Sequence, residues 1–240
     1  MPIEILFRAH GLLAVDKPPG LNVHDAPGPG RSVLRALSEA QGLKNLTPVH
    51  RLDKDASGVL LFAESKALAS EVQAAWAQAD KRYLALCVGI PDPQSGEIDA
   101  PILEHQTGKP ERLRNAVRYF EKTHPGEAVP PLPAPKTSAV HPAGRPSRTA
   151  YSTLEKFTAF ALLEVRPQQG RMHQIRVHLA HIGHPLALDP LYGAPVAAAS
   201  ALTRLPLHAA RLSFPFRGEI ISIAAPLAAD IAAFILNLKQ

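Results

Sequence analysis

Residues 50–63 read His-Arg-Leu-Asp-Lys-Asp-Ala-Ser-Gly-Val-Leu-Leu-Phe-Ala, a polar loop that runs directly into an apolar strand. Gly58 marks the end of the loop, and residues 59–63 have the continuous apolar character of a buried strand. Reactive side chains are often mounted on such a loop, held by a rigid scaffold. A surface turn in which Asp53 or Asp55 bonds nearby backbone amides fits the same spacing equally well.

The composition is that of a soluble globular protein. The chain has 240 residues, of which 46% are hydrophobic and 20% charged, enough to bury one substantial core. It contains neither a run of about 18 apolar residues, as a membrane span requires, nor a secretory signal. The single cysteine, Cys87, falls in an expected strand and excludes an intramolecular disulfide. Because such cysteine usage suits a reducing compartment, we expect a cytoplasmic location and a core position for Cys87.

Positive charge is concentrated in residues 106–150. Eight basic residues and three glutamates give this segment a net charge of +5, equal to that of the whole chain. Such a segment attracts polyanions, above all the phosphate backbone of a nucleic acid, although a solvated loop is the alternative. Residues 124–147 also contain seven prolines, which break helices and central strands. The pattern predicts a long basic loop or insertion at about 105–148.

Strands and helices are expected throughout the rest of the chain, whereas residues 91–110 are rich in turn signals. The pattern predicts strands at 3–7, 12–15, 59–63, 82–88, 149–157, 160–165, 207–214 and 220–224, and helices at 32–40, 65–79, 172–182 and 228–238. Strands that mostly adjoin, with few crossover helices, favour an α+β protein. We therefore predict one domain, 1–240, built on a mixed, mainly antiparallel sheet flanked by helices.

Residues 170–193 form a second informative stretch, Gly-Arg-Met-His-Gln-Ile-Arg-Val-His-Leu-Ala-His-Ile-Gly-His-Pro-Leu-Ala-Leu-Asp-Pro-Leu-Tyr-Gly. Helical spacing places Ile175, Leu179 and Ile182 on one buried face. Four histidines within twelve residues raise the question of a metal. However, no carboxylate precedes Asp189, and the His-Glu-x-x-His spacing of zinc hydrolases is absent. The pattern favours hydrogen-bonding histidines over metal ligands.

Together the two stretches resemble a known family. His-Arg-Leu-Asp-x-x-x-Ser-Gly at 50–58 and Gly-Arg-x-His-Gln-Ile-Arg-Val-His-Leu at 170–179 are similar to signatures of the RluA family of pseudouridine synthases. Three further segments resemble that family: Val-Asp-Lys-Pro-Pro-Gly-Leu at 15–21, Lys-Arg-Tyr-Leu-Ala-Leu at 81–86, and Leu-His-Ala-Ala-Arg-Leu at 207–212. The five motifs follow in order and cover most of the chain. The ordered set is a far more specific indication of the family than any one motif alone.

The chain departs from the family pattern at four positions. Ala56 stands where threonine is usual, and Leu188 stands where glycine commonly precedes the aspartate. Gln169 and Met172 replace frequent hydroxyl-bearing residues around Gly-Arg. None of the four is a candidate catalytic side chain, so they bear on loop geometry and substrate preference. Because the chain starts almost directly with the catalytic signature, it resembles the shorter, single-domain members.

The resemblance implies a catalytic set. Asp53 is the implied carboxylate, acting either as nucleophile on the sugar or as the base that takes its 2′ proton. It has to stay ionised when buried, and Arg176 is the implied partner that favours the charged form. Tyr83 is the implied base or proton relay at uracil carbon 5, although a core tyrosine on a strand is the alternative. Asp55 is expected to be structural.

RNA contacts are also implied. Reaching a uridine in folded RNA requires flipping it out, at a cost of a few kcal/mol. Arg51 is expected to approach the RNA backbone or to fill the gap left by the base, and Leu52 to pack beneath the base. Arg171, Lys17 and His50 are further candidates for RNA contact. Phosphate contacts from the basic insertion can offset the cost of flipping.

The resemblance implies an isomerase that needs no redox cofactor and no metal. Its expected partner is structured RNA, either transfer or ribosomal, and we expect a monomer with no membrane and no obligate protein partner. One alternative is a metal-dependent hydrolase built on His50, Asp53 and the histidines at 173–184. The other is an RNA-binding module that has lost catalysis, against which the presence of Asp53, Tyr83 and Arg176 argues.

Overall fold

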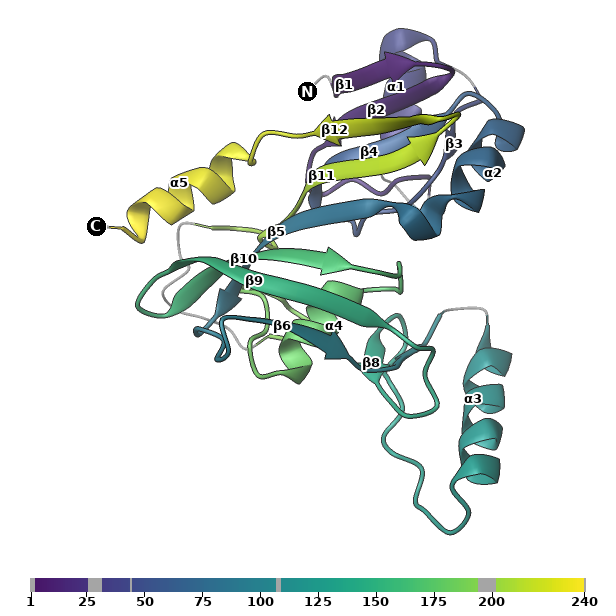
Figure 1. The fold of residues 1–240 in the computed structure, drawn as a ribbon, viewed down its shortest axis with the longest axis vertical. Helices are drawn as coiled ribbons and strands as arrows, with labels where there is room; N and C mark the ends of the chain where they lie inside the picture. The colour runs from purple at the N-terminus through teal and green to yellow at the C-terminus, as the bar shows by residue number, and fades with distance from the viewer. Residues whose placement is uncertain (1–2, 26–31, 44, 107–108, 194–201, 240) are drawn as a thin grey trace. The chain divides into compact units, whose positions relative to one another are not determined.

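The computed structural model describes residues 3–25, 32–43, 45–106, 109–193 and 202–239. The chain divides into two compact units (Figure 1). Unit 1 comprises Met1–Ala85 and Ala198–Gln240, and unit 2 comprises Leu86–Ala197.

Unit 1 is built on a mixed sheet. Its strands lie in the order β1 (Glu4–Ala9), β2 (Leu12–Lys17), β4 (Ser57–Ala63), β11 (Leu207–Phe216) and β5 (Asp80–Val88), with β3 (Thr47–Pro48) paired to β4 and β12 (Glu219–Ala224) paired to β11. β4 and β11 run parallel, and the other pairs of this unit are antiparallel. The predicted α+β class with a mixed, mainly antiparallel sheet is confirmed.

β4 is buried along its whole length because both faces of the sheet are covered. Leu60 and Phe62 pack into one core cluster with residues of α1 (Val33–Gln41). The alternate residues Val59 and Leu61 pack into a second cluster with residues of α2 (Lys66–Ala74). A strand buried on both sides has no polar face, which explains the unbroken apolar run in the sequence.

The helices of unit 1 begin where the sequence predicts. Ser32 caps α1 by accepting a hydrogen bond from the Arg35 amide, and Gly42 ends the helix in the left-handed conformation. α2 begins after Ser65 but is shorter than expected, because the chain tightens into a 3₁₀ turn at η1 (Trp76–Gln78). The closing helix is α5 (Ala229–Asn237).

Unit 2 contains the predicted hairpin of β9 (Arg148–Lys156) and β10 (Phe160–Pro167), with β6 (Ser95–Asp99) added antiparallel to β9. α4 (Gln174–His181) lies within the second informative stretch and is shorter than the predicted helix at 172–182. Cys87 is buried as expected. β6 lies in a segment that is rich in turn signals in the sequence, and only Ile98 of this strand is buried.

The basic insertion is more ordered than the sequence predicts. β7 (Ile102–Glu104) pairs with β8 (Ser138–Val140), and between them lies a helix, α3 (Pro110–Thr123). α3 buries Leu113 and Phe120, and the Phe120 ring stacks on His124 with 4.4 Å between centroids. The prediction of a long basic loop or insertion did not include this helix at 110–123. Among the helices that the structure describes, none is long and apolar enough to cross a membrane.

Candidate active site

The loop that carries Asp53 is fixed from beneath by Lys17. The Lys17 ammonium donates to the carbonyl oxygens of Pro18 (2.9 Å), Lys54 (2.8 Å) and Ala56 (2.7 Å), and the residue is fully buried. The sequence predicts an RNA contact for Lys17. The structure corrects this, because all three ammonium hydrogens are directed at backbone oxygens and the group is closed to solvent. Lys17 instead holds the backbone on either side of the turn that begins at Asp53.

Lys17 gives a prediction about stability. Lys17→Met keeps the length of the side chain but removes the ammonium donor from three carbonyl groups, of which only that of Lys54 keeps a second donor among the described residues, the Gly20 amide. We therefore expect the free energy of unfolding to fall by about 2 kcal/mol. Lys54→Met is the matched control, because Lys54 is exposed and contributes only its backbone to the clamp. Urea denaturation followed by circular dichroism measures both. Equal stability of the two variants would show that water replaces the ammonium without cost.

The same variant gives a prediction about pH. Burial lowers the pKa of Lys17 to about 8, against the opposing charges of Asp55 and Asp53. The unfolded value is about 10.4, so between these values the unfolded chain binds more protons than the folded chain. The contribution of Lys17 to the free energy of unfolding therefore rises with pH in that window, by at most about 1.4 kcal/mol per pH unit. We expect the stability difference between wild type and Lys17→Met to grow from pH 8 to about pH 10.

Gly58 brings the loop and Tyr83 into one region. A Cβ on Gly58 would lie 2.3 Å from the Ala209 carbonyl oxygen, and its φ of 105° favours glycine, so only glycine allows β4 and β11 to approach here. Ala209 pairs in turn with Tyr83 on β5. Burial, and then the charge of Asp53, raises the pKa of Tyr83 well above its usual value. Tyr83 is therefore a neutral phenol whose electrostatic surroundings include Asp53.

His50 also helps to hold the loop in place. Its Nε2 atom accepts a hydrogen bond from the Leu61 amide (3.1 Å), and its ring stacks on Trp76 with 5.2 Å between centroids. Burial lowers the pKa of His50 to about 4, which keeps the ring neutral and able to accept. The ring therefore anchors the start of the loop to β4, and the expected RNA contact of His50 remains a prediction.

Leu52 and Arg51 point to different environments. Leu52 is buried in the same cluster as Ala209, with Tyr83 packed against it, whereas Arg51 is exposed. Their expected contacts with the base and with the RNA backbone remain predictions.

A buried hydrogen bond joins the two strands beyond the loop. Ser57 Oγ lies 2.9 Å from His208 Nδ1, and both residues are buried. Burial lowers the pKa of His208. Both residues stand in motifs that resemble the family, but the sequence assigned neither a role. Ser57, a polar residue at the start of an apolar strand, was the signal in the sequence that could have pointed to this pair.

In unit 2, Arg176 forms a buried ion pair with Asp189. Its Nε and Nη2 atoms donate to the two carboxylate oxygens at 2.8 and 2.7 Å, and the side chains are 7% and 0% exposed. The guanidinium also lies over the Tyr192 ring, 5.2 Å from its centroid. Burial alone would raise the pKa of Asp189, but the hydrogen bond and charge of Arg176 and two backbone amides outweigh it, so the pKa lies below its usual value.

Asp189 was missed by the sequence analysis as a functional residue, although it is the only carboxylate in residues 170–193. Its position as the only carboxylate of this stretch was the available signal, because a buried arginine such as Arg176 requires a carboxylate nearby. Asp53 belongs to unit 1 and Arg176 to unit 2. Their expected pairing remains a prediction.

Three of the four histidines at 173–184 are hydrogen-bonded through their rings. His178 uses both ring nitrogens, with Thr149 Oγ1 at 2.8 Å and the Ala100 carbonyl oxygen at 2.9 Å. His173 and His184 each use one ring nitrogen, with the Tyr192 hydroxyl and a backbone carbonyl respectively. Within the described ranges, no three His, Cys, Asp or Glu side chains are grouped as a metal site would require.

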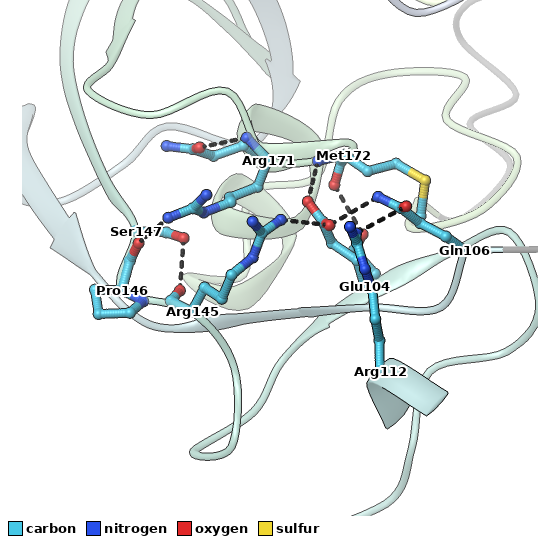
Figure 2. A network of polar contacts seen from close by, with 10 residues as sticks. Glu104, Gln106, Arg112, Arg145, Pro146, Ser147, Arg171 and Met172 are labelled. Carbon is cyan, nitrogen blue, oxygen red and sulfur yellow. Dashed lines mark hydrogen bonds and ion pairs between the residues drawn. The ribbon is translucent and has the colours of Figure 1, made fainter. Parts of the chain in front are cut away.

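Arg171 lies just before α4, in the network of Figure 2. Its backbone amide donates to Gln174 Oε1 at 3.0 Å, and its Nη2 atom donates to the Pro146 carbonyl oxygen at 3.2 Å. Its predicted contact with RNA is not tested by these bonds and remains a prediction.

Comparison with known proteins shows the family of this chain. The family model described as RNA pseudouridylate synthase matches residues 11–181, a span that contains Asp53, Tyr83 and Arg176. The chain belongs to this family. Two curated relatives are ribosomal large subunit pseudouridine synthase D of Nitrosomonas europaea, 38% identical, and of Haemophilus ducreyi, 32% identical. Both alignments cover 100% of this chain, and they cover 66% and 71% of the relatives.

The chain thus spans about two thirds of the length of the curated relatives it matches. Among solved structures, human RNA pseudouridylate synthase domain containing 4 has a TM-score of 0.74 at 24% identity, covering 98% of this chain and 93% of that one. This likeness concerns the fold. Family membership confirms the resemblance predicted from the five motifs.

Proposed function

We propose that this chain is an isomerase that converts specific uridines in RNA to pseudouridine. The observation that carries the proposal is the clamped loop. Within the span matched by the family, a buried ammonium fixes the backbone around Asp53, and the Asp53 charge acts on a partly buried, neutral tyrosine. An aspartate held in place beside a protonated phenol provides the two groups that the isomerisation requires.

The reaction breaks the bond between uracil N1 and the sugar C1′, rotates the base, and joins C5 to C1′. C5 loses a proton and N1 gains one, so the composition is unchanged. We assign the first step to Asp53, either as nucleophile at C1′ or as the base that removes the 2′ proton. Both routes use the ionised carboxylate. We propose that Arg176 favours this ionised form, as the motif resemblance implies, and that Asp189 holds the Arg176 guanidinium in position.

We assign Tyr83 to the proton at C5. Because burial and the nearby carboxylate charge both favour the protonated phenol, a free tyrosinate is disfavoured as the base. A neutral hydroxyl can relay a proton between C5 and a second acceptor, and its ring can pack against uracil. Of the two roles that the sequence left open, we therefore propose the relay.

We propose large-subunit ribosomal RNA as the first substrate to test, because two curated relatives are named for it. Arg51, Leu52 and Arg171 are the proposed RNA contacts. Ribosomal RNA from cells that lack this protein, labelled with tritium at uridine C5, is incubated with the wild-type chain. Release of tritium, followed by mapping of the new pseudouridine, supports the proposal. Intact RNA binding with no release from ribosomal or transfer RNA would favour a binding module.

The insertion gives a prediction about affinity. Arg114, Arg118 and Lys122 are exposed and spaced by four residues, so they form one ridge along α3. We expect replacing all three with alanine to weaken RNA binding by about tenfold or more and to reduce the slope of log affinity against log salt by about two to three. Filter binding at several salt concentrations measures both quantities.

The control for this prediction carries the same change of net charge. Arg8, Arg35 and Arg217 are exposed residues of unit 1 in surface ion pairs, and their replacement with alanine also removes three positive charges. An equal effect of the two triple variants would assign the loss to net charge rather than to α3. If the α3 variant kept the RNA affinity and salt slope of the wild type, α3 would not contribute to RNA binding.

The remaining assignments complete the proposal. We propose that residues 1–240 act as one catalytic domain that carries the insertion at about 105–148. The isomerisation transfers no electrons to an acceptor, and we propose that the chain works without a cofactor, as a monomer, in the cytoplasm.

A further inference from the structure

Glu104 is a buried carboxylate at the centre of a polar network in unit 2 (Figure 2). Its side chain is 5% exposed and accepts from Arg145 Nη2 at 2.6 Å, from Gln106 Nε2 at 2.9 Å and from the Met172 amide at 2.8 Å. Glu104 ends β7, and Met172 lies in the segment before α4. The carboxylate therefore joins the insertion to the segment that carries Arg171.

Three arginines gather around this one carboxylate. Arg112, on α3, donates to Gln106 Oε1 at 2.9 Å, and Figure 2 shows the Arg171 side chain next to that of Arg145. Burial and then the charge of Arg145 lower the pKa of Arg171, and the charge of Glu104 opposes them. Three guanidinium groups and one carboxylate leave the arginine cluster, Arg112, Arg145 and Arg171, with an excess of two positive charges.

The cluster has donors that the protein does not use. Arg171 Nε is buried and has no hydrogen-bond partner among the described residues. The Arg145 side chain is 54% exposed although its Nη2 atom is bound to Glu104, so this side chain remains accessible from solvent. Like charges held side by side are unfavourable unless an anion accompanies them. Guanidinium groups bind phosphate oxygens through paired, charge-assisted hydrogen bonds, which makes phosphate the anion of best fit.

We propose that the arginine cluster binds a backbone phosphate of the RNA substrate, with Glu104 fixing the position of Arg145. The inference rests on the proposed function, because it takes RNA as the ligand. It adds a phosphate site, separate from the base-handling residues, at which the insertion and the segment before α4 hold the same strand.

The first test is Arg145→Gln, compared with Arg166→Gln. Arg166 is also an exposed arginine of unit 2 paired with a glutamate, so the control removes the same charge. We expect Arg145→Gln to weaken RNA binding by about tenfold and to lower the salt slope by about one, because one phosphate contact is lost. Arg166→Gln should leave both values unchanged. Equal affinities of the two variants would overturn the proposal.

A double variant separates contact with RNA from a structural role. Arg145→Gln leaves the Glu104 charge buried without its main partner, so this single variant loses stability as well as affinity. Adding Glu104→Gln removes that charge and should restore stability. If Arg145 binds phosphate, the double variant is stable but still binds RNA weakly. If Arg145 only neutralises Glu104, RNA affinity returns together with stability, and the proposal fails.

Two further measurements identify the ligand and its dependence on the proposed function. Inorganic phosphate should weaken RNA binding to the wild type more than to Arg145→Gln at equal ionic strength, made up with chloride. Equal competition would overturn the assignment of phosphate. Wild-type tritium release is measured on the same RNA. Its absence would refute the proposed function, whereas normal release with an unaffected Arg145→Gln variant would refute the phosphate site alone.

Discussion

Asp53→Asn is expected to lower tritium release from uridine-labelled RNA by at least about a thousandfold while leaving the chain folded and bound to RNA. Asparagine has the shape of aspartate but has no negative charge and no basic oxygen. It therefore supports neither attack on C1′ nor removal of the 2′ proton. Because the loop is held through its backbone by Lys17, the substitution leaves the clamp intact.

The matched control is Asp55→Asn. Asp55 lies two residues away on the same loop, is exposed, and contributes its charge to the surroundings of Lys17 as Asp53 does. We expect this variant to keep most of the activity, since Asp55 has no assigned step. Tritium release and RNA affinity are measured for both variants under the same salt. Equal release by the two would remove Asp53 from its role at the sugar.

Local signals made much of the fold predictable. The start and end of α1 follow from Ser32 and Gly42, whose effects depend on residues only a few positions away. The buried strand β4 follows from its own apolar run, and the β9–β10 hairpin follows from two strands that adjoin in sequence. Features of this kind do not depend on which distant segments meet.

The roles of Lys17 and His50 were not predictable for the opposite reason. Both stand in motifs that the sequence connects with RNA, and a lysine in such a motif reads as a phosphate contact. What determines the role of Lys17 is its burial against Lys54 and Ala56, about forty positions along the chain, and this depends on the pairing of β2 with β4. The motif locates the site without indicating which side chains face the substrate.

α3 shows how a real signal can be hidden. Leu113, Ala116, Val117 and Phe120 have the spacing of an amphipathic helix, and Pro110 occupies a position favoured at a helix start. These apolar residues stand among six charged ones, next to a segment rich in proline. The high charge and the nearby prolines therefore led to the prediction of a loop or insertion, although the apolar residues have helical spacing.

Leu188 illustrates a departure from the family pattern with a structural consequence. It has a φ of 55°, a left-handed conformation that costs glycine nothing and a residue with a Cβ about 1–2 kcal/mol. Glycine is common at this position in the family that the chain resembles. The residue directly precedes Asp189, so the unfavourable backbone conformation lies next to the carboxylate that holds Arg176.

Asp189→Asn is expected to lower the free energy of unfolding by about 3–5 kcal/mol, because it removes the negative charge that faces the buried Arg176 guanidinium. Glu71→Gln is the control, since it breaks a solvent-exposed pair with Arg217 and should change the free energy of unfolding far less. Urea denaturation followed by circular dichroism measures both variants. A loss no larger than that of the control would show that Arg176 finds another partner, and would remove Asp189 as its support.

The acid dependence of stability provides an independent test of the same pair. The pKa of Asp189 is lowered in the folded state, so this group adds stability that is fully present above its unfolded value of about 3.9 and is lost as the pH falls below it. The variant has no such group to titrate. The stability difference between wild type and Asp189→Asn should therefore be constant near neutral pH and shrink below about pH 4. A difference that stays constant into acid would mean that the variant loses packing rather than charge pairing, and Asp189 would then not act on Arg176 electrostatically.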